Sequence, residues 1–205
     1  MFISFEGLDY SGKTTQASML ADALKRDGRN VILLREPGGT FISEKVRSIL
    51  LDEKHAEITP VAELLLFSAA RNQLVRQVIQ PALKDKKIVI CDRFVDSTTV
   101  YQGSGRGLDS EDVKAVNRIA TGGIMPRFTF FLDVGVEEML RRREIAPGAA
   151  DRMESSGIEF YGRVRDGFWS LAQEAPHRFI VVNGMQSIEE IHLDIRNFIR
   201  KKANL

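Results

Sequence analysis

Short apolar runs alternate with longer helix-period stretches along this chain, and that alternation restricts the folds open to it. The runs are rich in β-branched and aromatic residues and are bounded by turn or charged residues, as buried parallel strands are. The strands expected are Phe2–Phe5, Val31–Leu34, Ile88–Cys91, Phe179–Val182 and, with one Thr inside it, Phe128–Leu132.

Between these runs the apolar residues recur with the spacing of a helix. Thr59 and Pro60 form an N-cap and first-position pair, which favours a helix start there. The helices expected are Lys13–Arg26, Pro60–Ile79, Glu111–Ala120, Val136–Arg143, Gly157–Glu174 and Ser187–Lys202. Strands that alternate with helices predict an α/β fold, with a five-stranded parallel sheet covered by helices on both faces. Because no linker, repeat or low-complexity segment interrupts the pattern, residues 1–205 are predicted to form one domain.

Composition excludes several classes of function. The 29 basic and 28 acidic residues balance, so the surplus of Lys and Arg typical of a nucleic-acid binder is missing. Apolar runs reach only four residues, whereas a membrane span needs about 20. A single cysteine, Cys91, indicates a reducing compartment, and with three scattered histidines it cannot supply a zinc site. No signal peptide is recognisable, so we expect a cytoplasmic protein without membrane or nucleic-acid partners.

The segment Gly7–Thr14 matches the phosphate-binding pattern G-x-x-x-x-G-K-[ST] between an expected strand and an expected helix. Glycines let the backbone turn its N–H groups toward phosphate oxygens, and the helix N-terminus adds a positive dipole. Lys13 reaches the β- and γ-phosphates, and the Thr14 hydroxyl can bind Mg²⁺. The residues expected to bind ATP are Gly7, Leu8, Asp9, Tyr10, Ser11, Gly12, Lys13, Thr14 and Thr15.

This loop alone does not name the reaction, because switch GTPases, motors and small-molecule kinases share it. The chain lacks the Asn-Lys-x-Asp motif with which GTPases read guanine, and it has Asp92-Arg93-Phe94 where they carry Asp-x-x-Gly. A kinase would need a second substrate pocket beside the loop. Two segments that directly follow expected strands, Arg35–Thr40 and Asp92–Gly103, supply polar and cationic groups at that sheet edge.

Taken together, these segments resemble the thymidylate kinase family over nearly the whole chain. The motifs are G-x-D-x-x-G-K-T-T-Q at Gly7–Gln16, R-E-P-G-G-T at Arg35–Thr40, F-x-A-x-R at Phe67–Arg71, D-R-F-x-x-S-x-x-Y-Q-G at Asp92–Gly103 and D-R-x-E at Asp151–Glu154. The resemblance implies a P-loop NTPase fold with a mobile lid. It implies phosphorylation of dTMP to dTDP by ATP with Mg²⁺, in dTTP biosynthesis, usually in a homodimer. A kinase for another nucleotide or deoxynucleoside, and a P-loop ATPase or switch without an acceptor, remain the alternatives.

The resemblance also assigns roles in the acceptor site. It makes Arg93 the clamp of the dTMP phosphate, Arg47 a second phosphate contact, and Phe67 and Arg71 the partners of thymine. On spacing alone, Phe67 would be a core residue and Arg47 a solvated helix residue. The residues expected to bind dTMP are Asp9, Glu36, Pro37, Arg47, Phe67, Arg71, Arg93, Ser97, Thr98, Tyr101 and Gln102.

Carboxylates near the phosphates are expected to serve the metal. Asp92 ends the third expected strand and could hold a water on Mg²⁺, although a strand-end turn residue or an ion pair would look the same in sequence. Asp9 lies inside the loop, where the family uses it for the acceptor sugar or the metal shell. The metal site is therefore expected to comprise Thr14, Asp9 and Asp92.

A lid is expected at about residues 144–152, a stretch rich in Pro, Gly and Ala between arginines. Because the loop reads Asp9-Tyr10-Ser11, it carries no arginine, which resembles the bacterial type whose lid supplies one. The lid departs from the family pattern of alternating arginines, so the sequence leaves open which arginine reaches the phosphates. The catalytic residues expected are Asp9, Lys13, Arg93, Arg142, Arg143 and Arg152. The sequence also leaves open which arginine lies next to the adenine of ATP, and Arg141 is one suggestion.

Overall fold

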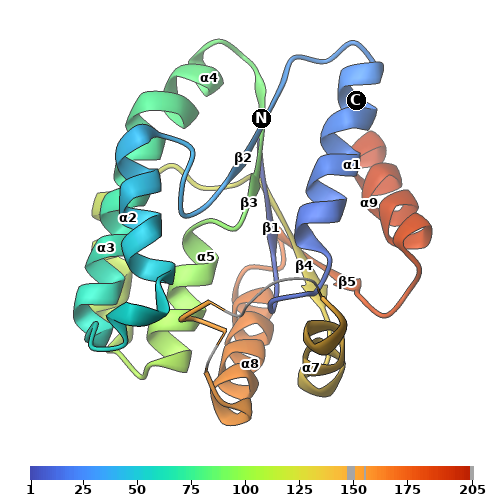
Figure 1. The fold of residues 1–205 in the computed structure, drawn as a ribbon. Helices are drawn as coiled ribbons and strands as arrows, with labels where there is room; N and C mark the ends of the chain where they lie inside the picture. Colours follow the sequence, from blue (N-terminus) through green and yellow to red (C-terminus); the bar gives the residue numbers. More distant parts are fainter. Residues whose placement is uncertain (147–150, 155, 204–205) are drawn as a thin grey trace.

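Five parallel strands form one sheet at the centre of the molecule (Figure 1). The structure is a computed structural model that describes residues 1–146, 151–154 and 156–203. The strands lie in the order β2-β3-β1-β4-β5. Their bounds are Phe2–Glu6 for β1, Val31–Arg35 for β2, Ile88–Asp92 for β3, Phe128–Asp133 for β4 and Phe179–Asn183 for β5. All five expected strands are confirmed, each within a residue or two of its predicted ends.

Helices cover both faces of the sheet, as predicted. The helices are α1 (Lys13–Arg26), α2 (Phe41–Leu51), α3 (Pro60–Leu74), α4 (Gln80–Lys84), α5 (Val95–Thr98), α6 (Ser110–Thr121), α7 (Val136–Ile145), α8 (Ile158–Glu174) and α9 (Ile188–Ala203). Single turns of other helix types lie at Glu53–His55 (3₁₀), Val75–Ile79 and Thr99–Gly105 (both π). None of the helices in the described part of the chain is long and apolar enough to span a membrane.

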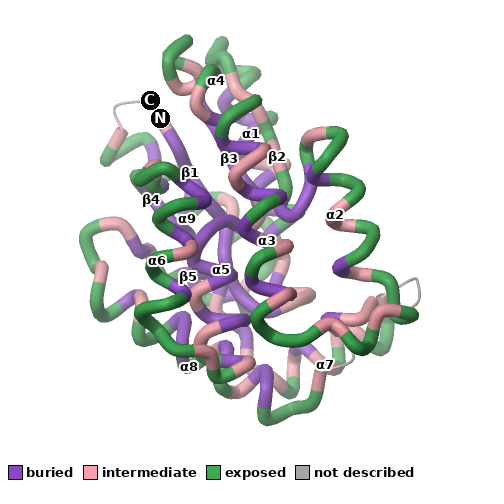
Figure 2. The backbone as a smooth tube through the Cα atoms, turned by 90° about the vertical axis from the view of Figure 1, so that its left-hand side faces the viewer, coloured by how far each residue is buried: buried purple, intermediate pink, exposed green. Residues whose placement is uncertain are grey.

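Each face of the sheet has its own core. Along β1, Ile3 and Phe5 point to the side where α1 and α9 pack next to each other, because successive strand residues face opposite sides. Phe2 points to the opposite side, where α3, α4 and the π turn between them cover the sheet. A further cluster packs α8 and the Thr99–Gly105 turn against Phe131. Figure 2 shows the three central strands, β1, β3 and β4, mainly in purple, whereas the helices also carry green, exposed stretches.

Two local expectations were wrong. The runs Val31–Leu34 and Phe179–Val182 were both expected to be buried, but β2 and β5 are the two edge strands of the sheet. The residues of β2 are half-buried or exposed, and in β5 Ile180 is half-buried and Val181 exposed. No helix was expected in the segment after β3, yet it is helical from Val95 to Gly105. Its Ser and Thr residues have low helix propensity, so tertiary packing against α6 and α8 imposes the helix there.

Candidate active site

A cavity of about 540 Å³ opens at the carboxyl ends of β1, β2 and β3. Ligands of open α/β sheets bind at this edge, where the order of the strands reverses. The sequence-predicted residues that line the cavity are Asp9, Tyr10, Gly12, Lys13, Thr14, Thr15, Glu36, Pro37, Arg47, Phe67, Arg71, Asp92, Arg93, Ser97, Thr98, Tyr101, Gln102 and Arg142. Residues from the phosphate loop and from the motifs at Arg35–Thr40, Phe67–Arg71 and Asp92–Gly103 therefore line one cavity.

The phosphate loop connects β1 to α1 with the conformation that its glycines allow. Gly7 has φ +140°, and a Cβ there would lie 2.5 Å from the carbonyl oxygen of Leu132, so no larger residue fits. Gly12, with φ +93°, is the N-cap of α1. Lys13 is buried, and its Nζ donates to the Leu8 carbonyl at 2.5 Å and to Ser11 Oγ at 3.3 Å. Burial lowers the pKa of Lys13 to about 8.

Thr14 and Asp92 lie side by side at the start of α1 and the end of β3. The Thr14 hydroxyl donates to Asp92 Oδ2 at 2.5 Å. The other oxygen, Oδ1, is buried and has no hydrogen-bond partner among the described residues. An unpaired buried carboxylate oxygen is costly without a donor or a cation, so this pair fits a hydrated Mg²⁺. The described residues contain no cluster of three His, Cys, Asp or Glu side chains that would bind a metal by itself.

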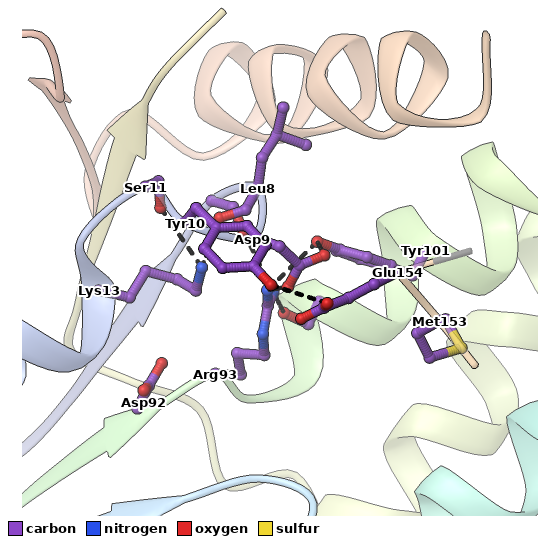
Figure 3. Close-up of polar contacts among 12 residues, drawn as sticks. Leu8, Asp9, Tyr10, Ser11, Lys13, Asp92, Arg93, Tyr101, Met153 and Glu154 are labelled. Carbon is purple, nitrogen blue, oxygen red and sulfur yellow. Dashed lines mark hydrogen bonds and ion pairs between the residues drawn. The ribbon is translucent and has the colours of Figure 1, made fainter. Parts of the chain in front are cut away.

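Arg93 lines the cavity and is the centre of a group of polar contacts that joins the phosphate loop to the helical segment after β3 (Figure 3). Its Nη2 donates to Asp9 Oδ1 at 2.5 Å, and its Nη1 donates to the Gly7 carbonyl and to Ser97 Oγ, both at 3.1 Å. The Tyr101 hydroxyl donates to Asp9 Oδ2 at 3.3 Å. Although burial raises the pKa of Asp9, the charges of Arg93 and Lys13 outweigh it and hold that pKa below its usual value.

A buried carboxylate lies directly behind this centre. Glu6, the last residue of β1, accepts from the Phe94 amide at 2.8 Å and from the Ser97 hydroxyl at 2.5 Å. Burial, reinforced by nearby Asp96, raises the pKa of Glu6 to about 8. Glu6 thereby holds the segment that carries Arg93, a role that sequence analysis did not assign. It stands immediately before the loop motif, but only the fold brings it next to Ser97.

The far end of the cavity carries Phe67 and Arg71, one helical turn apart on α3. Phe67 is half-buried and lines the cavity, so it is not the core residue that its spacing alone suggested. Arg71 is 2% exposed, and its guanidinium donates to Glu36 Oε2 at 2.7 Å and to Thr98 Oγ1 at 2.8 Å. Arg47, from α2, donates to the Pro37 carbonyl at 3.0 Å.

The expected lid residues divide into two groups. Arg142, on α7, lines the cavity and donates to the Tyr10 carbonyl at 3.3 Å. Arg143 and Arg152 do not line it: Arg143 donates to the Glu154 carbonyl at 2.8 Å, and Arg152 forms a 2.8 Å ion pair with Glu63. Of the expected lid at 144–152, residues 147–150 lie outside the described residues.

Arg141 also lies away from the cavity, paired with Glu138 at the surface. Gly7, Leu8 and Ser11 belong to the loop but are not among the cavity-lining residues.

Some cavity residues were not predicted from the sequence. Tyr10 donates its hydroxyl to Glu154 Oε2 at 2.7 Å, which joins the phosphate loop to the segment after the lid (Figure 3). The motif at Asp151–Glu154 was the available signal, but only its arginine had been singled out. The cavity-lining residues missed are Arg35, Leu51, Asp151, Met153 and Glu154.

Comparison with known proteins shows that this chain matches one family in both sequence and structure. Residues 5–195 match the family model described as thymidylate kinase. The chain is 49% identical over 200 residues to the thymidylate kinase of Thermoanaerobacter sp. (strain X514), covering 98% of this chain and 97% of that protein. It is 50% identical to the thymidylate kinase of Chlorobium luteolum, covering 94% and 93%. The crystal structure of thymidylate kinase from Ehrlichia chaffeensis superimposes with a TM-score of 0.80 at 39% identity, over 97% of this chain and 98% of that one.

Proposed function

The chain belongs to the thymidylate kinase family and is a dTMP kinase that uses ATP, and we propose that it transfers the γ-phosphoryl group within the cavity described above. The observation that carries the proposal is that one cavity holds a phosphate loop at one end and Phe67 with Arg71 at the other, with Arg93 between them. A kinase needs this arrangement of two nucleotide sites, whereas a P-loop ATPase or switch needs only the first.

The acceptor binds between α3 and the helical segment after β3. Phe67 stacks on the base, and Arg71, held by Glu36 and Thr98, donates to a base carbonyl. Arg93 and Arg47 bind the acceptor phosphate, while Tyr101 and Asp9 contact the sugar. The remaining acceptor contacts come from residues at the same end of the cavity, namely Glu36, Pro37, Ser97, Thr98 and Gln102.

Transfer rests on position and charge, with no covalent enzyme intermediate. Lys13, the loop N–H groups and the α1 N-terminus bind the donor phosphates, which directs the γ-phosphoryl toward the acceptor. Arg93 lies between the two sites, so it can contact both phosphates as charge develops. Arg142 adds a second cation from α7, because it alone among the three expected lid arginines lines the cavity.

Thr14 and Asp92 are proposed to hold Mg²⁺, Thr14 directly and Asp92 through water. The ion would neutralise charge on the β- and γ-phosphates. Asp9 is engaged by Arg93 and Tyr101, so we assign it to the acceptor site and give it at most an outer position around the metal.

We also propose a homodimer in the cytoplasm, built from one domain spanning residues 1–205 and without nucleic-acid or membrane partners. Three helices packed side by side, α2, α3 and α6, expose large apolar side chains. These are Phe41, Ile42 and Ile49 on α2, Val61 and Leu65 on α3, and Ile119 on α6. Light scattering should give twice the chain mass for the wild type, and Leu65→Glu with Ile119→Glu should give the monomer.

An acceptor panel tests the function. With ATP and Mg²⁺, dTMP should be phosphorylated far faster than dCMP, dAMP, dGMP or thymidine, and Lys13→Met should abolish the reaction. Preference for another monophosphate or for a nucleoside would make the chain a kinase of that acceptor. Slow ATP hydrolysis that no acceptor accelerates would make it an ATPase or switch and refute the proposal.

A further inference from the structure

A buried carboxylate on α3 contacts the acceptor site from behind, through Gln102. Glu63 is 1% exposed and lies one helical turn before Phe67, so Glu63, Phe67 and Arg71 share one face of α3. Oε1 of Glu63 accepts from Gln102 Nε2 at 2.8 Å and from Arg106 Nε at 3.2 Å. Oε2 accepts from Arg152 at 2.8 Å and from Arg106 Nη2 at 3.3 Å.

The contact with Glu63 fixes which way the Gln102 amide points. A carboxylate can only accept, so the amide must turn its NH₂ group toward Glu63. Arg106 and Arg152 help to keep Glu63 ionised: although burial raises its pKa, their hydrogen bonds outweigh that effect. Gln102 itself lines the cavity. Its carbonyl oxygen is therefore the amide atom that can meet a ligand there.

We propose that Glu63 determines base specificity by holding Gln102 as a hydrogen-bond acceptor toward the pyrimidine N3 position. Thymine carries a hydrogen on N3, whereas the cytosine ring has a lone pair there and an amino group in place of O4. An amide oxygen at that point favours thymine and meets the cytosine N3 lone pair unfavourably. This inference rests on the proposed dTMP site, and Glu63 acts in it as a positioning residue that does not touch substrate.

Glu63→Gln is the informative substitution because it leaves one side-chain oxygen where Glu63 has two, and two arginines donate hydrogen bonds to this position. Arg106 and Arg152 both need an oxygen, so the single carbonyl oxygen of the new side chain would turn to them. Its NH₂ group would then face Gln102, and the Gln102 amide would rotate to accept from it. The cavity would receive an NH₂ group in place of an oxygen, which suits cytosine.

The test compares dissociation constants of the acceptor monophosphates dTMP, dUMP and dCMP, measured by titration calorimetry on the full-length protein. In Glu63→Gln, dTMP and dUMP should bind about tenfold more weakly and dCMP no more weakly than in the wild type. The ratio of dTMP to dCMP affinity should fall at least tenfold, while ATP affinity stays within about twofold. Arg106→Met is the matched control, because it removes a partner of Glu63 but leaves the contact with Gln102; its ratio should not change.

A double substitution isolates the route through Gln102. In a Gln102→Ala background, Glu63→Gln should leave the dTMP to dCMP ratio unchanged, since no amide remains to be oriented. If Glu63→Gln unfolds the protein, the charge-matched variant Glu63→Gln with Arg106→Met replaces it, since it removes both members of that ion pair.

Equal weakening of dTMP and dCMP, an unchanged ratio, or the same shift without Gln102 would each overturn the inference. A wild type that does not prefer dTMP to dCMP would instead overturn the proposed function itself.

Discussion

Replacing Arg142 by Met tests whether this side chain stabilises the negative charge of the transition state. Arg142 donates to Glu138 at 2.7 Å, to the Gly184 carbonyl at 2.9 Å and to the Tyr10 carbonyl at 3.3 Å, which holds its guanidinium beside the phosphate loop. A cation used only in the transition state lowers kcat when removed and leaves substrate affinity nearly unchanged. We expect Arg142→Met to lower kcat by roughly 10²-fold or more.

Unfolding of the variant would not account for the expected loss of activity. A 10²-fold fall in kcat corresponds to about 2.7 kcal/mol of transition-state stabilisation. The ion pair joins Arg142 to Glu138, one turn earlier on the same helix, and is partly exposed to solvent, so it contributes roughly 0.3–0.5 kcal/mol to stability. The two carbonyl contacts add about 1–3 kcal/mol together. A domain of typical stability, about 5–15 kcal/mol, stays folded after that loss.

The assay measures kcat by coupled ADP detection and ATP affinity by titration, beside thermal melting. Arg141→Met is the control, because Arg141 pairs with the same Glu138 but is solvent-exposed and does not line the cavity. Its kcat should stay within about twofold of the wild type. If kcat stays within about tenfold of the wild type in Arg142→Met, Arg143→Met and Arg152→Met alike, the hypothesis that an arginine near the lid stabilises the transition state is wrong. Arg93 must then carry the charge alone.

Three further predictions concern the acceptor site and its support. Phe67→Ala should weaken dTMP binding by about 1–3 kcal/mol, measured by calorimetry, with ATP binding unchanged, because only the acceptor base stacks there; equal losses for both would refute it. Because Tyr101 is assigned to the acceptor sugar, Tyr101→Ala should reduce the ratio of kcat/KM for dTMP to kcat/KM for the corresponding ribonucleotide. Tyr101→Phe, which keeps the ring, should leave this ratio unchanged. An unchanged ratio in a folded Tyr101→Ala variant would reject the assignment of Tyr101 to the sugar. In the folded state the pKa of Glu6 is raised from 4.5 to about 8. Between these pH values the folded protein keeps a proton on Glu6 that the unfolded chain releases. The free energy of unfolding therefore falls as the pH rises from 4.5 to about 8. Glu6→Gln should flatten that fall in denaturant titrations across the same range, and a parallel pH profile would contradict the cause.

The strands and the phosphate loop were predictable because their signals are local. Each strand is a short run whose apolar residues must be buried, and Gly7 and Gly12 carry the positive φ angles that the loop requires. The exposure of β2 was not predictable, since a run such as Val31–Leu34 does not show whether a second strand pairs with its outer edge. The helix over Val95–Gly105 also depends on partners distant in sequence, because α6 and α8 pack against it.

The same distinction between local signals and contacts distant in sequence holds for the site residues. The sequence analysis identified Arg47, Arg71, Arg93 and Arg142 of the cavity, but it did not predict which acid holds which arginine. Arg71 is held by Glu36, Arg93 by Asp9 and Arg152 by Glu63. Asp9 and Glu36 were expected to contact the substrate, whereas Glu63 was not among the expected site residues. The sequence of one segment does not show that its arginine will form an ion pair with an acid from a distant segment.

These acids have a physical reason to be present. An unrestrained arginine side chain carries about 2 kcal/mol of rotamer entropy, which a phosphate would have to overcome on binding. A carboxylate that accepts from one edge of the guanidinium fixes its direction before the substrate arrives, and five N–H donors leave others free for phosphate or base. The arrangement also excludes some candidates: Arg152 is 8% exposed in its side chain and bound to Glu63, so it is oriented away from the cavity. The acid behind each arginine thus decides which cations can take part in phosphoryl transfer, and this information exists only in the fold.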